Sequence, residues 1–208
     1  MHREDYKNQI ELNHRFRDLY KKDFMKRLEF ARDNGCNTIV LTGNGEPLCN
    51  HRFLEFFSEW NNQLRSSFKW IELQTSGVML DDEKLRWLRN DIGVSTISLS
   101  LSDVFVSQKN YEYNGTPQNL QRDNFINHTC SEIKRYDFNL RLSLNMTDSY
   151  NKQSIDEIFK KCKELGANQI TFRELYESPI SETPENKWIR KHKIADKKLF
   201  AIKKICPN

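Results

Sequence analysis

Residues 42–48, with the sequence TGNGEPL, combine the residue types best suited to ligand chemistry in this chain of 208 residues. Gly43 and Gly45 allow the backbone to approach a ligand closely and to aim its amide and carbonyl groups at it. Glu46 adds a carboxylate that suits an ammonium group, and Pro47 stiffens the turn. The segment lacks the lysine and the spacing of a phosphate-binding loop. We therefore expect it to recognise an amine-bearing ligand, and a purely structural turn is the alternative.

Polar residues that alternate with apolar ones supply further candidates. Residues 96–102 (TISLSLS) and 140–145 (LRLSLN) place polar side chains on one face of a strand and apolar side chains on the other. A parallel sheet that is buried on both faces has continuous apolar strands instead. We interpret the polar face as the lining of a wet or ligand-filled cavity. An antiparallel sheet with one solvated face would show the same alternation and is the alternative.

The elements that must position these residues follow from hydrophobic periodicity. We expect strands at residues 38–42, 68–75, 94–101, 140–145 and 169–175. We expect helices at residues 24–34, 53–64, 82–90, 125–133 and 155–165, a loop at 102–117, and loop plus the start of a helix at 1–22. Strands that alternate with helices indicate an α/β fold with a parallel sheet. Ligands bind such folds at the carboxyl ends of the strands.

Composition narrows the class of protein. No stretch approaches 18 apolar residues, and no apolar segment follows the first residues, so we expect a soluble, cytoplasmic protein without a membrane partner. The net charge of +4 is too small to imply nucleic acid by itself. The five cysteines contain no CxxC pair, which argues against a zinc site or a disulfide framework.

Five segments, in order, resemble the radical S-adenosylmethionine (radical SAM) superfamily. Residues 39–48 (IVLTGNGEPL) are similar to its GGEP segment, and the later segments are similar to the ends of its following strands: 74–77 (QTSG), 97–103 (ISLSLSD), 141–145 (RLSLN) and 170–175 (ITFREL). The resemblance implies an α/β fold, a partial (β/α)6 TIM-like barrel with a polar lumen, over residues 1–176. The first strand and the loop for the iron–sulfur cluster would be missing.

The same resemblance implies S-adenosylmethionine as the cofactor. It places Gly43, Asn44, Gly45 and Glu46 at the methionine amino group, Ser98, Ser100, Arg141 and Asn145 near the ribose and carboxylate, and Arg173 near the adenine or the substrate. Asn44 replaces the small Gly that is usual in the family and could crowd the methionine end. Each assignment has a structural alternative: the serines could bond only within the lumen, Asn145 could be a turn residue, and Arg141 could pair with Glu72 or Glu174.

The resemblance also implies a 4Fe-4S cluster held by a CxxxCxxC triad, which this sequence lacks. We expect no metal ligands in this chain and a cluster only in a longer, full-length protein. The leading hypothesis is the core domain of a radical SAM oxidoreductase that would cleave S-adenosylmethionine to a 5′-deoxyadenosyl radical, using an electron donor and acting on an unknown substrate. The chain as it stands would then be inactive. The alternative is a cluster-less barrel that binds a nucleoside or a protein without catalysis. An unrelated hydrolase or lyase that uses Glu46, Asp103 and Glu174 ranks last.

Residues 177–208 are predicted to form a linker and a basic C-terminal helix, because prolines precede a lysine-rich amphipathic stretch. The helix could meet an acidic partner or cover the barrel mouth. A solvated face with its apolar side docked on the core is the simpler interpretation. Nucleic acid is an improbable partner on this charge.

Overall fold

The computed structural model describes residues 3–43 and 45–205, with side chains from residue 7 onward. The chain divides into two compact units, which we describe separately. Unit 1 comprises residues up to Ser98 together with 136–138, and unit 2 comprises 99–135 and 139–208. Within the described ranges no helix is long and apolar enough to cross a membrane.

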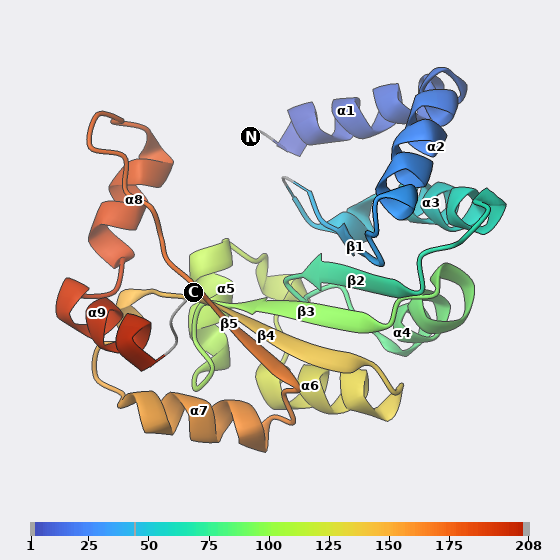
Figure 1. Ribbon diagram of the computed structural model, residues 1–208. Coiled ribbons are helices and arrows are strands. Elements are labelled where there is room, and N and C mark those ends of the chain that lie inside the picture. Colours follow the sequence, from blue (N-terminus) through green and yellow to red (C-terminus); the bar gives the residue numbers. More distant parts are fainter. Residues whose placement is uncertain (1–2, 44, 206–208) are drawn as a thin grey trace. The chain divides into compact units, whose positions relative to one another are not determined.

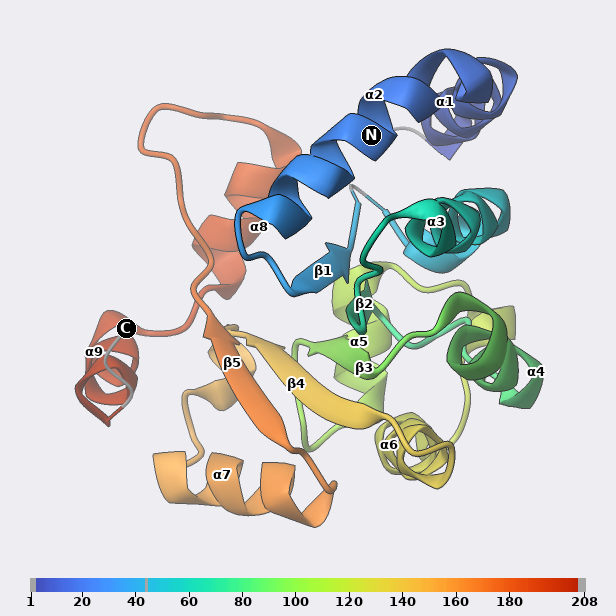
Figure 2. The same ribbon diagram turned by 45° about the vertical axis from the view of Figure 1, so that its right-hand side comes forward.

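Five strands form one open sheet in the order of the sequence (Figures 1 and 2). They are β1 (Thr38–Leu41), β2 (Trp70–Thr75), β3 (Thr96–Leu101), β4 (Asn139–Asn145) and β5 (Gln169–Arg173). The pairs β1–β2 and β4–β5 are parallel. This confirms the α/β class and the parallel sheet, and it excludes the antiparallel alternative. An open five-stranded sheet is consistent with a partial TIM-like barrel.

The helices of unit 1 alternate with the first two strands along the chain. They are α1 (Arg3–Arg15), α2 (Arg17–Asp33), α3 (His51–Gln63) and α4 (Asp82–Trp87), with a 3-10 turn η1 (Pro47–Cys49) and a π-helical turn η2 (Leu88–Ile92). Local capping fixes where they begin: the Asn50 side chain accepts from the Phe53 amide at 3.3 Å, and the Asp81 side chain accepts from the Lys84 amide at 2.8 Å. Leu73 is fully buried in the core of this unit.

In unit 2, helices cover the apolar face of β4 and β5. This unit contains α5 (Ser107–Asn114), η3 (Gln118–Leu120), α6 (Phe125–Arg135), η4 (Asp148–Tyr150), α7 (Ile155–Glu164), α8 (Pro184–His192) and α9 (Asp196–Ile205). Leu140, Leu142 and Leu144 of β4 are fully buried. Phe159 of α7 meets Phe172 of β5 edge to face, with ring centroids 5.8 Å apart. The opposite face of these strands therefore carries the polar residues.

Three expectations about local structure were wrong. Residues 107–114, expected as loop, form α5, because the buried Asn110 side chain bonds the backbone of Ser102 and Asp103 and so holds a helix of weak periodicity. Residues 3–15, expected largely as loop, form α1. The single basic helix expected near the C-terminus is two helices, α8 and α9, separated at residues 193–195.

Candidate functional site

In unit 1 the Glu46 carboxylate joins the loop after β1 to the end of β2. Its Oε1 accepts from the Thr75 hydroxyl at 2.7 Å and from the Leu48 amide at 3.4 Å. Its Oε2 accepts from both the amide and the hydroxyl of Ser76, at 3.0 and 2.7 Å. A carboxylate offers about four acceptor positions, so these four donors occupy most of its capacity. Glu46 therefore holds the loop in place, and its contact with a ligand stays a prediction.

The Glu46 carboxylate also affects its neighbour Cys49. Partial burial of its sulfur, with the Glu46 charge as the smaller cause, raises the pKa of the Cys49 thiol, although the residue as a whole is exposed. Its Sγ lies 3.5 Å from the Met79 sulfur. Cys49 is therefore held as a thiol and is poorly suited to be a nucleophile.

The glycine positions of the loop are open. Gly43 and Gly45 are exposed, and a methyl group added at Gly43 would meet no atom within 4 Å. The φ angle of Gly43 lies outside the left-handed region, so the fold itself does not require glycine there. Asn44 lies outside the described residues. The fold does not require glycine at position 43, and the space beside it is open. Both features are typical of a backbone that a ligand approaches closely.

A pocket of about 200 Å³ adjoins this loop within unit 1. It is lined by Gln9, Ile10, Asn13, Leu41, Thr42, Gly43, Pro47, Asn50, Phe53 and Leu54. Its lining carries no charged side chain: three carboxamides and one hydroxyl stand among apolar groups. This surface suits a neutral polar group rather than a free charge.

On β3 the two predicted serines differ. Ser98 is only 1% exposed, and its Oγ finds no hydrogen-bond partner among the described residues. Ser100 is half-buried. A buried hydroxyl without a partner costs stability, so Ser98 fits a site whose partner is a ligand. Sequence alone could not separate the two serines, because both lie on the same strand face.

In unit 2 the predicted residues lie in register across β4 and β5. Arg141 stands opposite Gln169, and Asn145 stands opposite Arg173. The Arg141 guanidinium donates to the Gln169 Oε1 from Nε at 2.8 Å and from Nη2 at 2.5 Å. The pairing of Arg141 with Glu174 expected as an alternative is not seen; Glu174 instead forms an ion pair with Lys203 at 2.7 Å.

At the carboxyl end of β4 the side chains approach those that follow β3. The Asn145 amide donates to the Ser102 hydroxyl at 3.5 Å, and the Thr147 hydroxyl donates to the Ser102 carbonyl at 2.8 Å. Arg173, at the end of β5, is exposed. Asn145 therefore has a structural contact with the residue that follows β3. Its predicted role towards a cofactor stays a prediction, as does that of Arg173.

Asp103, a candidate for carboxylate chemistry, has a structural role. It is 3% exposed, and its Oδ1 accepts from the amides of Phe105 and Val106 at 2.6 and 2.9 Å. These bonds form the turn that precedes α5. The hydrolase or lyase hypothesis thereby loses one of its three carboxylates, because Asp103 is neither open nor placed to exchange protons with a substrate.

Sequence reasoning missed an aromatic cluster between α5 and α8 in unit 2. The Tyr113 hydroxyl donates to Asp148 at 2.8 Å, and its ring packs against those of Trp188 and His192 with centroids 5.5 and 5.4 Å apart. Burial, followed by the hydrogen bond and charge of Asp148, raises the pKa of Tyr113 to about 12. The cluster attaches α8 to the rest of unit 2. Its members are spread over 80 positions of the sequence, which hid it.

Most basic residues of α8, and Lys193 directly after it, form ion pairs with nearby carboxylates of unit 2. Arg190 contacts Glu177 at 2.9 Å and Glu182 at 3.4 Å, Lys193 contacts Glu177 at 2.7 Å, and Lys187 lies 3.7 Å from Glu182. Because carboxylates of the same unit meet these charges, the segment is a weak candidate for an acidic partner. That nucleic acid is not a partner stays a prediction.

The four cysteines that the structure describes do not fit an iron–sulfur cluster. Cys36 and Cys49 are exposed, whereas Cys130 and Cys162 are buried in α6 and α7. Burial raises the pKa of Cys130 to about 12 and that of Cys162 to about 11, so both remain thiols. Among the residues that the structure describes, no three His, Cys, Asp or Glu side chains gather as a metal site. A cluster with three thiolate ligands has no place on these residues.

Comparison with known proteins identifies the fold. No protein-family model matches the chain, and no curated protein sequence is similar to it. Among solved structures, anSMEcpe with bound AdoMet is similar with a TM-score of 0.56 at 17% identity, over 81% of this chain and 46% of that one. A radical SAM methyltransferase from Sphaerobacter thermophilus is similar with a TM-score of 0.51 at 17% identity, over 84% of this chain and 50% of that one.

Streptococcus suis SuiB bound to S-adenosylmethionine is also similar, with a TM-score of 0.50 at 18% identity over 82% of this chain. The chain thus has the fold of radical SAM enzymes, as the resemblance of its segments predicted. This chain spans less than half the length of two of the solved proteins: it covers 46% of anSMEcpe and 38% of SuiB. At these identities the likeness shows the fold alone.

Proposed function

We propose that this chain is the S-adenosylmethionine-binding core of a radical SAM enzyme. The observation that carries the proposal is the loop after β1, which is open at Gly43 and fastened through Glu46 to the turn after β2. A fold like that of proteins solved with bound S-adenosylmethionine supports it.

The residues of this chain can meet the chemical groups of S-adenosylmethionine. Because Glu46 is largely occupied by donors of its own unit, the backbone carbonyls of Thr42 and Gly43 are the acceptors for the methionine ammonium group in this proposal. The unpaired Ser98 hydroxyl, which can donate or accept, is a partner for a ribose hydroxyl. Arg141 and Asn145, in unit 2, carry donor groups of the kind that a carboxylate accepts.

The radical chemistry requires a cluster that the described residues do not fit. We therefore derive no step through a cluster, and its thiolates would come from residues outside this sequence. The role of an oxidoreductase, the electron donor and the substrate remain proposals for a longer protein. Held with iron, sulfide and a reductant under anaerobic conditions, the 208-residue chain is expected to release no 5′-deoxyadenosine. Its release at enzymatic rates would contradict this proposal.

Ligand binding tests the proposal directly. Ligand-observed NMR with S-adenosylmethionine and 5′-deoxyadenosine detects weak complexes and needs no cluster. We expect both ligands to bind the purified chain and Ser98→Ala to weaken them by about tenfold, the loss of one buried hydrogen bond. The matched control is Ser58→Ala, because Ser58 lies on α3, where its hydroxyl donates to the Asp91 carbonyl at 2.8 Å. Absence of binding by both ligands would overturn the proposal.

A further inference from the structure

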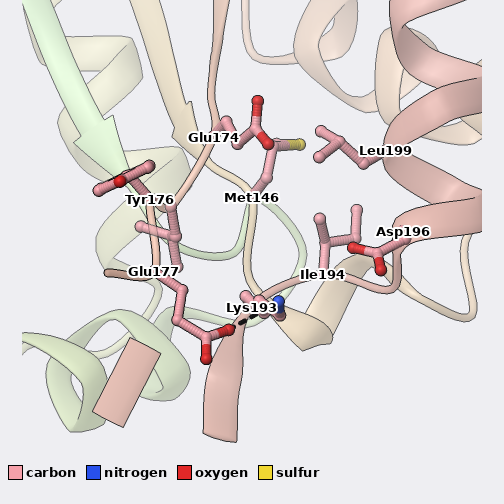
Figure 3. Close-up of a pocket in the computed structure, with 9 residues that line it drawn as sticks. Met146, Glu174, Tyr176, Glu177, Lys193, Ile194, Asp196 and Leu199 are labelled. Atoms are coloured by element: carbon pink, nitrogen blue, oxygen red, sulfur yellow. Dashed lines mark ion pairs between the residues drawn. The ribbon is translucent and has the colours of Figure 1, made fainter. Parts of the chain in front are cut away.

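A second pocket of about 200 Å³ lies in unit 2, where β4 and β5 end (Figure 3). Its apolar lining is Met146, Leu175, Ile194 and Leu199, and its polar lining is Glu174, Tyr176, Glu177, Lys193 and Asp196. Small-molecule pockets for drug-sized ligands are larger, at about 300–1,000 Å³. The volume therefore suits one small metabolite.

Backbone hydrogen bonds preform this pocket. The Met146 amide donates to the Arg173 carbonyl at 2.8 Å, which extends the β4–β5 ladder past Asn145. The Ile194 amide donates to the Met146 carbonyl at 3.0 Å, and Thr147 and Lys193 form an antiparallel bridge. Met146 and Ile194 are buried. The pocket walls are thus part of the sheet and of the chain fastened to it, so a ligand would not have to order them.

The charges of the pocket are of both signs and are separated along it. Figure 3 shows the Lys193–Glu177 ion pair at one end, Glu174, Met146 and Leu199 at the other, and Ile194 and Asp196 between them. Lys193 has three donors, and Glu177 at 2.7 Å occupies one of them. Its side chain keeps 38% of its surface exposed, so the other donors are accessible. Asp196 forms no ion pair with any described residue, and Glu174 is paired with Lys203.

We propose that this pocket binds a free α-amino acid with an apolar side chain. The ligand carboxylate meets Lys193, its ammonium group meets Asp196, and its side chain lies on Met146 and Leu199. Other small ligands fit less well: a phosphate would face three carboxylates, a simple cation would face Lys193, and a purely apolar molecule would bury charges without partners. The inference uses residues of unit 2 alone and does not rest on the function proposed above.

Ligands that each lack one charge test this inference. The purified chain is titrated with L-leucine, with 3-methylbutylamine, which lacks the carboxylate, and with 4-methylpentanoate, which lacks the ammonium group. L-Leucine is expected to bind, and each analogue to bind at least about tenfold more weakly, since each loses one charge-assisted contact. Calorimetry or NMR shift changes at residues 193–199 report binding. No binding of leucine, or equal binding of all three, would overturn the inference.

Variants of the chain locate the site. Asp196→Asn removes one charge from the pocket and is expected to lower the affinity for leucine by about tenfold or more. Leu199→Phe reduces the space for the ligand side chain and is expected to abolish binding. Glu185→Gln is the matched control, because Glu185 is an exposed carboxylate in the first turn of α8 outside the pocket lining. The affinity of a variant is compared with that of the natural chain only if the two have the same melting temperature. Unaltered leucine binding by Asp196→Asn and Leu199→Phe would place any leucine site elsewhere and overturn the assignment.

Discussion

The strand ends of the two units use polar side chains in opposite ways. After β1 and β2, the Glu46 side chain is fixed by hydrogen bonds to the loop and to the next turn. After β4 and β5, Glu177 pairs with Lys193 and Glu174 pairs with Lys203 at a partly exposed surface. Fixed acceptors bound by backbone amides shape a loop, whereas exposed ion pairs contribute little stability and can exchange partners. The first region therefore resists change, and the second can adapt.

Glu46→Ala is the change expected to have the largest effect. It leaves the Ser76 amide and the Thr75 hydroxyl without their acceptor, and each buried group that loses its partner costs about 1–3 kcal/mol. We expect the free energy of unfolding to fall by about 2–3 kcal/mol in urea titrations. Glu55→Ala, an exposed carboxylate on α3, should change it by less than about 0.5 kcal/mol. Equal, small effects of both variants would mean that Glu46 does not hold the loop.

Thr147→Val examines a buried hydroxyl of unit 2 that has a partner. Thr147 is 1% exposed and donates to the Ser102 carbonyl at 2.8 Å. Losing this bond should lower the free energy of unfolding by about 1–2 kcal/mol, which denaturant titration measures. A neutral result would show that the contact after β4 is dispensable, and the strand ends of unit 2 would then be adaptable throughout.

Ser98→Ala examines a buried hydroxyl that has no partner among the described residues. In contrast to Thr147→Val, this change is expected to raise the free energy of unfolding. Removing the Ser98 Oγ relieves an unsatisfied polar group, so the ligand-free chain should gain up to about 1 kcal/mol in the free energy of unfolding. The same variant should bind S-adenosylmethionine more weakly. A loss of stability above 1 kcal/mol would show that the hydroxyl already has a structural partner.

Gly43→Ala should leave the fold almost unchanged. The added methyl group meets no atom within 4 Å, and the backbone angle suits alanine. Melting temperatures should agree within the effect of about 0.5 kcal/mol that is usual for surface changes. The affinity for S-adenosylmethionine, measured by NMR, should nevertheless fall, because the methyl group occupies the space of close approach. A destabilised variant would assign this glycine to folding instead of binding.

The smallest effect on stability is expected from acid, which should weaken the ion pairs of unit 2. Hydrogen bonds from Lys193 and then from Arg190 lower the pKa of Glu177 in the folded chain. A lowered pKa means that the pairs stabilise the fold above the ordinary pKa of Glu and lose this contribution as the pH falls through the folded value. The stability difference between the natural chain and Glu177→Gln should thus shrink in acid. A difference independent of pH would exclude these pairs as its source.

The sequence predicted the regular elements better than the contacts between them. The helix predicted at 53–64 and the strands predicted at 68–75 and 140–145 carry strong periodicity, and the structure confirms them within a few residues. Helix α5 was missed because its stability comes from the tertiary contacts of Asn110. The position of Glu46 at a strand end was predictable, but its partners Thr75 and Ser76 lie about 30 residues later. The second pocket joins three distant segments, so no local pattern could indicate it.

The turn after β2 carries a hydrogen-bond relay with one direction. The Gly77 amide donates to the Thr75 hydroxyl at 3.0 Å, and that hydroxyl donates onward to Glu46. Gly77 has a φ of 79°, which residues with a side chain rarely adopt. Replacing Gly77 would thus disturb the far loop through Thr75, although the two positions are more than 30 residues apart. The conformation of the loop after β1 therefore depends on a glycine in another turn of the same unit.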